Sequence, residues 1–308
     1  MQLDRTAIAI AQRSADELFD LSLLVIRRYW AKIVPVAILG AAPFFLLNYF
    51  FLRPITDYEQ LVMASRDFVP SEGFHFRYLW TMLCLVFLQA PLAMSGVTYF
   101  LGQAVFNQET SLRQLTRVLA SRMFSLLFVI GLLRGAALSL LFSFWLYATP
   151  TLYPEWELVF LSILFGFVFF LVRSFRPFAP EILLLEQCPL RKKAGALSDE
   201  QSYAKRSGRL HASSGDIFSI QLAISFLALV FVLVMCAGSL FINGAVLGLW
   251  RWGWWMDVIF FPAILWLMAI WETVIRFLLY LNVRIRLEGW EIYLRFKAEL
   301  QRLVEAKA

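Results

Sequence analysis

Long runs of apolar residues dominate the chain and alternate with shorter segments that are polar and basic. A membrane-spanning helix needs about 20 mostly apolar residues, because each residue adds about 1.5 Å and the hydrocarbon layer is about 30 Å thick. We predict six such helices, at residues 33–52, 78–101, 123–148, 153–172, 217–242 and 258–280. The predicted fold class is therefore all-α, a polytopic membrane helical bundle whose transmembrane domain covers residues 33–280.

The first 32 residues follow a different pattern from the predicted spans. They contain Asp4, Asp16, Glu17 and Asp20, and they lack the compact apolar core of a signal peptide. Ser14 is followed three residues later by Glu17, which matches a helix capping box. We expect residues 1–32 to contain an amphipathic helix at the membrane surface that leads into the first span.

Three polar segments join or follow the predicted spans on one side of the membrane. A short surface helix is expected to begin near Thr110. The loop 173–216 starts with an apolar half and continues with a polar, basic half that we expect to be solvated and mobile. Residues 281–308 are expected to form a basic amphipathic tail helix.

Composition supports the membrane class and indicates an orientation. Hydrophobic residues make up 60% of the 308 and the mean hydropathy is +0.69, above the roughly 45–50% apolar content of soluble domains. The net charge of +6 does not predict nucleic-acid binding, because the basic residues flank apolar spans. The connections after the first, third and fifth predicted spans hold only Arg53, Arg66, Arg77 and Arg251 as basic residues, whereas the termini and the other connections hold many more. The positive-inside rule therefore places both termini in the cytoplasm, and we expect a bacterial inner membrane.

Two ionisable residues fall within the predicted spans at considerable depth. Arg134 lies in the middle of the third span and Glu272 in the sixth, and a lone charge there costs about 2.5 to 3.5 kcal/mol. We predict a buried contact between them, with Gln89 of the second span nearby. An alternative partner for Glu272 is Arg276, four residues further along the same helix. Such a site either ties helices together or lies on a substrate or proton pathway.

A second set of candidates is basic and lies near the predicted cytoplasmic surface. These residues would attract anionic lipid headgroups or a partner protein, with ordinary topology determinants as the alternative. They are Arg173, Arg176, Arg191, Lys192, Lys193, Arg284 and Arg286. Membrane lipids, and cytoplasmic or membrane proteins binding through residues 173–216 and 281–308, are the expected partners.

Known catalytic patterns are missing from the sequence. It contains no HExxH, GxSxG, P-loop or glycine-rich dinucleotide motif. Cys84, Cys188 and Cys236 are scattered without CxxC spacing, so the sequence predicts neither a metal site nor a disulfide framework. We therefore expect no catalytic activity and no cofactor.

Three segments carry a resemblance to other proteins: RPFAPEILLLE (176–186), KRSGRL (205–210) and YLNVRIRLEGWEIYLRF (280–296). They resemble segments of bacterial integral membrane proteins, including the membrane domains attached to glycerophosphodiester phosphodiesterases. Such a tail has an R-x-R-x-E-G-like core, here Arg284, Arg286, Glu288 and Gly289, but Asn282 stands where an acid is frequent. The resemblance implies a membrane module and transfers no activity, since no phosphodiesterase catalytic domain accompanies these spans.

Two functional hypotheses follow from the sequence. The first is a scaffold or regulatory component of a membrane-associated complex, without catalytic activity, that works through the basic loop and tail. The second is a small transporter or lipid-handling protein with a buried polar site around Arg134, Glu272 and Gln89. A water-accessible cavity that reaches Arg134 from either face would favour the second hypothesis, whereas a sealed, tightly packed bundle would count against transport.

Overall fold

A computed structural model describes much of the chain: residues 12–64, 72–105, 108, 110–132, 171, 174–191, 201–212, 214–248, 250, 252–253 and 255–289, with side chains left aside at 54–64, 72–77, 214 and 247. This part of the chain is helical, without strands. Four of its helices are long and apolar enough to cross a membrane: Ala15–Arg53, Leu112–Leu132, Gly215–Val246 and Met256–Glu288. A bent helix pair would make a fifth crossing.

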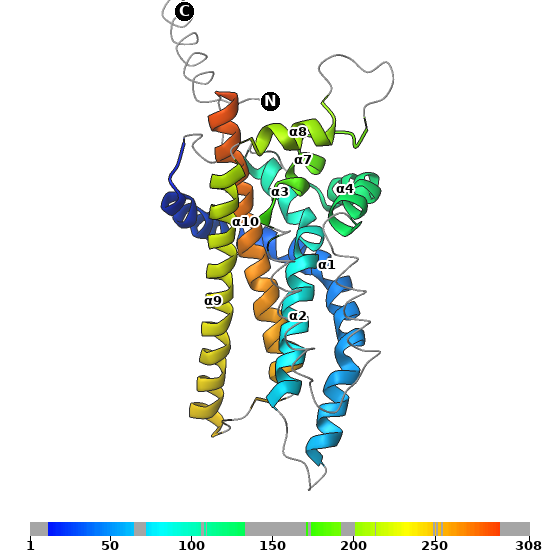
Figure 1. Ribbon diagram of the computed structural model, residues 1–308, viewed down its shortest axis with the longest axis vertical. Helices are drawn as coiled ribbons and strands as arrows, with labels where there is room; N and C mark the ends of the chain where they lie inside the picture. The colour runs from blue at the N-terminus through cyan, green and yellow to red at the C-terminus, as the bar shows by residue number, and fades with distance from the viewer. Residues whose placement is uncertain are drawn as a thin grey trace, which may run out of the picture.

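Helix α1 (Ala15–Ala64) joins the predicted surface helix and the first predicted span in one element. The expected capping box is confirmed, because the Ser14 backbone N–H donates to Glu17 Oε2 and the Glu17 N–H donates to Ser14 Oγ, each at 3.3 Å. The first turns of α1 run across the bundle and the later turns run along it (Figure 1). Pro35 and Pro43 lie within α1, and each removes a helical hydrogen bond.

The second predicted span, 78–101, is broken rather than straight. Helix α2 (Glu72–Ala93) and helix α3 (Ser95–Val105) meet at an angle of 43°. Pro91 lies in the last turn of α2, and Ser95 Oγ donates to its carbonyl oxygen at 3.0 Å. Helix α1 passes very close to this break, because a Cβ on Gly40 would lie 2.1 Å from the backbone oxygen of Ala93. Only glycine fits at position 40 without moving a backbone.

Helix α4 (Leu112–Leu126) begins at the N-cap Ser111, close to the helix start expected near Thr110. It continues into the π-helix η1 (Leu127–Leu132), so the expected surface helix and the start of the third span form one continuous stretch. The rest of that span, Arg134 included, lies outside the described residues, as does the fourth span apart from Leu171.

The last two predicted spans are present as long helices. Helix α9 (Ser214–Leu247) contains residues 217–242, and the π-helix η2 (Met256–Phe260) followed by α10 (Phe261–Glu288) contains residues 258–280. Helix α10 extends past the predicted end of the span and stops where Gly289 adopts the left-handed conformation, with φ of 63°. The first part of the predicted tail therefore continues the last span.

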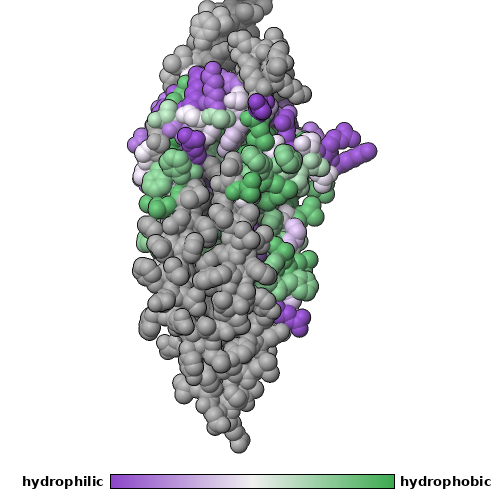
Figure 2. Space-filling model, turned by 45° about the vertical axis from the view of Figure 1, so that its right-hand side comes forward, coloured by the Kyte–Doolittle hydropathy of each residue, from purple (hydrophilic) through white to green (hydrophobic). Residues whose placement is uncertain are grey.

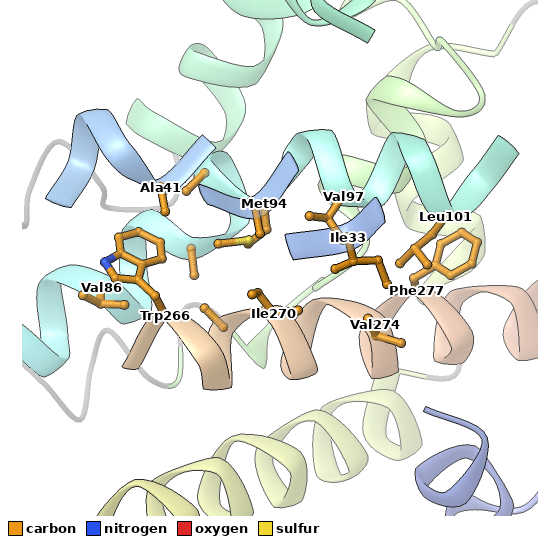
Figure 3. Packing of buried hydrophobic residues seen from close by; sticks show 14 of the residues in the cluster. Ile33, Ala41, Val86, Met94, Val97, Leu101, Trp266, Ile270, Val274 and Phe277 are labelled. Carbon is orange, nitrogen blue, oxygen red and sulfur yellow. The ribbon is translucent and has the colours of Figure 1, made fainter. Parts of the chain in front are cut away.

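The hydrophobic core lies around α10, which packs against α1, α2, α3 and α9. Figure 3 shows Ile33 and Ala41 of α1 facing Met94 and Val97, with Ile270 and Val274 of α10 below them. Helices α2, α9 and α10 and the later turns of α1 run along the long axis (Figure 1). Helices α3, α4, α7 (Ala179–Leu184) and α8 (Tyr203–Leu210) gather at one end of the bundle. Figure 2 shows hydrophilic residues at that same end and hydrophobic residues below it.

Candidate functional site

The most unusual feature of α10 is a stripe of polar side chains at every fourth position. Residues four apart are neighbours on a helix surface but are turned by about 40°, so the stripe extends for about 24 Å along α10 while it winds toward the opposite side. Its members are Glu272, Arg276, Tyr280, Arg284 and Glu288. The first two contact α9 and α7, and the last three share one network at the end of the helix.

Glu272 lies in the apolar part of the bundle and contacts α9. Its Oε1 accepts a hydrogen bond from Gln221 Nε2 at 3.1 Å and another from Ser225 Oγ at 3.2 Å. All three side chains are buried. Ser225 lies four residues after Gln221, so helical geometry brings both donors to one face of α9, where they reach the carboxylate.

The Glu272 carboxylate lines a cavity of about 680 Å³. Helix α2 contributes lining residues between Trp80 and Ala90, α9 between Ser219 and Val232, and α10 between Leu265 and Glu272. Its walls are almost entirely hydrocarbon, and among the described lining residues Glu272 is the charged one. This volume falls within the roughly 300 to 1,000 Å³ of ligand-binding pockets.

Arg276, one turn further along α10, forms a deeply buried ion pair. Its Nε donates to Glu181 Oε1 at 2.9 Å, and the two side chains are 2% and 0% exposed. Arg276 Nη2 also donates to Thr98 Oγ1 of α3 at 3.4 Å. Glu181 belongs to the short helix α7 (Ala179–Leu184), every residue of which is buried. The pair therefore joins α7 to both α10 and α3.

The end of α10 forms a denser network with α8 (Tyr203–Leu210) and with the segment that follows α7. Arg206 of α8 donates to both Glu186 and Glu288, with 2.6 Å between Arg206 Nη2 and Glu186 Oε1. Tyr280 Oη donates to the same Glu186 oxygen at 2.6 Å. Arg284 Nη2 donates to Glu288 Oε2 at 2.8 Å. The guanidinium groups of Arg206 and Arg284 thus alternate with the carboxylates of Glu186 and Glu288 beside the Tyr280 hydroxyl.

We call this end of the molecule the polar cap: residues 174–191 and 201–212 together with 280–288 of α10. Aromatic rings pack in its interior. The Phe178 ring stacks on the His211 ring with 5.0 Å between centroids, and it makes an edge contact with Tyr280 with 5.8 Å between centroids. Residues 203–210 of the polar half of loop 173–216 form helix α8, and the expectation that this half is solvated is wrong for its inward-facing side chains. There, Arg206, Ser207 and His211 are buried in the cap.

The charges of the cap stabilise one another. Burial by itself would lower the pKa of the Arg206 guanidinium, but its hydrogen bonds and charge interactions with Glu186 and Glu288 outweigh burial and raise that pKa. At the edge of the cap, burial and the neighbouring Glu186 raise the pKa of the Cys188 thiol. Both shifts favour a charged Arg206 guanidinium and a protonated Cys188 thiol at neutral pH.

The structure places the residues of the predicted buried site in separate contacts. Gln89 exchanges two hydrogen bonds with Asn48 of α1, at 2.8 and 2.9 Å, and both side chains are buried. Arg276 pairs with Glu181 in place of the local pair with Glu272 that the sequence left open. The predicted contact between Arg134 and Glu272 lies outside the described residues.

The seven basic residues predicted to lie near the cytoplasmic surface differ in their exposure. Arg176 and Arg191 are exposed on the cap, as is Arg286 at the end of α10. Arg284 is instead partly buried in the ion network. Arg173, Lys192 and Lys193 lie outside the described residues. Three of the seven are thus exposed in the part of the chain that the structure describes.

Several site residues were missed by sequence reasoning. Glu181, Glu186 and Arg206 lie in a loop whose fold depends on distant helices, so local pattern alone did not single them out. Gln221 and Ser225 are uncharged and fall in an otherwise apolar span. One signal was present in the sequence: the spacing of four between the polar residues of α10, which the predicted boundary between span and tail at residue 280 divided in two.

Searches against protein families, curated proteins and solved structures find no match to this chain. Among the described residues, no three His, Cys, Asp or Glu side chains come together as metal ligands would. The cavity, the stripe on α10 and the polar cap are the features of the molecule that point to a function.

Proposed function

We propose that this chain is an integral membrane protein that binds a lipid-like molecule between α2, α9 and α10 and acts as a small transporter or lipid-handling protein. The cavity of about 680 Å³ with the Glu272 carboxylate in its wall carries this proposal. A purely structural bundle closes such spaces, because interiors pack as densely as organic crystals. An apolar pocket with a few convergent polar groups is the usual form of a binding site.

The proposed topology has six crossings, with the polar cap and both termini in the cytoplasm of a bacterial inner membrane. Four apolar helices and the bent pair α2–α3 support five of the crossings. The sixth is residues 153–172. Arg176, Arg191 and Arg286 support the orientation, since basic residues near span ends remain on the cytoplasmic side.

A scaffold is the second candidate, and one observation favours it. The polar cap is held by buried ion pairs and leaves Arg176, Arg191 and Arg286 on the outside, as a rigid basic platform for a protein partner would require. The scaffold hypothesis assigns no role to the cavity. The two candidates are therefore separated by filling the cavity while leaving the cap intact.

The test is a substitution that fills the cavity. Ala228 lines it from α9, so Ala228→Phe is expected to displace bound lipid. Ala237→Phe, on an exposed position of the same helix, is the matched control. Native mass spectrometry of each purified protein counts the lipids that remain bound. We expect the retained lipid to be lost in Ala228→Phe and kept in Ala237→Phe, and equal retention in both variants would reject the proposal.

A further inference from the structure

Five cations on the side of the polar cap form no ion pair with any residue that the structure describes. Helix α1 contributes Arg27, Arg28 and Lys32, and α4 contributes Arg113 and Arg117. All five side chains are exposed, whereas the arginines inside the cap are paired with carboxylates. Exposed cations of this kind can bind an anion from outside the protein.

Exposed apolar side chains accompany these cations in both helices. In α1, Leu24 is 59% exposed and lies one turn before Arg27 and Arg28. In α4, Leu112 is 64% exposed beside Arg113, and Phe124, further along the helix, is 77% exposed. Cations mixed with exposed hydrocarbon are typical of a helix at the boundary between lipid headgroups and the hydrocarbon layer, because long basic side chains can reach the headgroups.

The tertiary structure brings the two basic segments together around α3. A Cβ on Gly96 of α3 would lie 3.0 Å from Val36 Cγ1 of α1 and 3.7 Å from Leu119 Cδ1 of α4. Val36 lies one turn after Lys32, and Leu119 lies two residues after Arg117. The first turns of α1 run across the bundle, and α4 lies at the end that carries the polar cap (Figure 1). Segments far apart in the sequence thus flank α3 at one level.

The charge of this region is positive where the two helices approach α3. Helix α4 contains no acidic residue. The acids of α1 among the described residues nearby are Asp16, Glu17 and Asp20, in its first turns. Asp20 is seven residues before Arg27, which is roughly 10 Å along the helix. A ligand that complements this surface therefore carries negative charge, and it also has hydrocarbon to cover the exposed apolar side chains.

We infer that this region binds anionic phospholipids of the leaflet on the side of the polar cap. We call it the α1–α4 surface, defined by Arg27, Arg28, Lys32, Arg113 and Arg117. Guanidinium and ammonium groups bind the phosphate, and the exposed apolar side chains contact the acyl chains. None of the five residues lines the cavity, so this inference goes beyond the proposed function and does not depend on it.

The test compares two lipids with the same acyl chains, phosphatidylglycerol and phosphatidylcholine. Each is titrated into the purified protein in neutral detergent, and native mass spectrometry measures its affinity. A basic residue near an anionic membrane surface contributes roughly fivefold in affinity, so phosphatidylglycerol should bind the wild type at least about fivefold more tightly. Equal affinity for the two lipids would overturn the inference. Soluble glycerol phosphate should not displace the lipid, and displacement at an equal concentration would overturn a lipid as the occupant.

Two variants and a matched control locate the preference on the α1–α4 surface. Arg27→Gln with Arg28→Gln and Lys32→Gln, and separately Arg113→Gln with Arg117→Gln, should each reduce the preference by about fivefold or more. The control is Lys205→Gln with Arg209→Gln, which removes two exposed cations of α8. It should keep the wild-type preference.

The substituted side chains are exposed, so all three proteins should fold, and thermal unfolding checks this. A control that loses as much preference as Arg113→Gln with Arg117→Gln would show a net-charge effect and overturn the site. A loss in only one of the two variants would overturn the shared surface. Ala228→Phe should leave the preference unchanged, because it alters the cavity alone.

Discussion

The two halves of α10 bury polar side chains in opposite ways. Around Glu272 a few polar groups of α9 and α10 meet beside an open apolar volume. Around Arg276, Arg284 and Glu288 the charged side chains form acid–base pairs, and the neighbouring helix α7 is buried throughout. A region with open apolar volume suits an exchangeable molecule. A region whose buried acids and bases form ion pairs suits a fixed connection between helices.

The largest loss of stability is expected when the buried ion pair between Glu181 and Arg276 is broken. Glu181→Ala leaves the Arg276 guanidinium buried without its carboxylate, and removing one partner of a buried pair costs about 3 to 5 kcal/mol. Thermal unfolding in detergent micelles measures the loss. The double variant Glu181→Leu with Arg276→Leu is the control, and we expect it to be much closer to the wild type. A double variant as unstable as the single one would contradict the interpretation.

The second prediction compares two arginines of α8. Arg206 donates to two carboxylates in the cap, whereas Arg209 is exposed. Hydrogen bonds to charged groups are worth about 1.5 to 3 kcal/mol, so Arg206→Ala should lower the free energy of unfolding by at least that amount. Arg209→Ala should stay within about 0.5 kcal/mol of the wild type. Hydrogen exchange of residues 176–186 should rise in Arg206→Ala alone, and similar exchange in both variants would argue against the network.

A third pair of substitutions adds the same volume to each region. Ala179 is fully buried in the cap and packs with Leu126 and Ile130, whereas Ala228 has Trp271 and Ile275 on one side and the cavity on the other. Ala179→Leu should destabilise the protein by about 1 to 3 kcal/mol, because a packed core has no room for added methylenes. Ala228→Leu should leave thermal stability nearly unchanged. Equal losses would show that the cavity is not an open volume.

The smallest effect is expected at the uncharged pair between α1 and α2. Asn48 and Gln89 exchange two hydrogen bonds in the apolar part of the bundle. Such contacts between membrane helices average about 0.6 kcal/mol and reach about 1.7. Gln89→Leu should therefore lower the free energy of unfolding by less than any of the cap substitutions above except Arg209→Ala. A double-mutant cycle with Asn48→Leu in micelles isolates the coupling, and a value above that of the Glu181 pair would reverse the comparison.

Much of the fold could be predicted locally. Apolar runs predicted the helices that contain residues 33–52, 217–242 and 258–280, and Ser14 with Glu17 predicted the start of α1. These features depend on residues within a few turns of each other. The 43° bend at the end of α2 was less predictable, because Pro91 frees a carbonyl but only the packing of α1 against Ala93 fixes a close approach there.

By itself the sequence determined that the chain forms long apolar helices, because hydrocarbon length and backbone hydrogen bonding leave a run of 20 apolar residues few alternatives. Only the tertiary structure decided which polar groups meet. Arg276 lies four residues from Glu272 but pairs with Glu181, 95 positions away along the chain. The physical reason is that the partner of a buried charge depends on which helices pack together, and helix packing brings together side chains that are remote in the sequence.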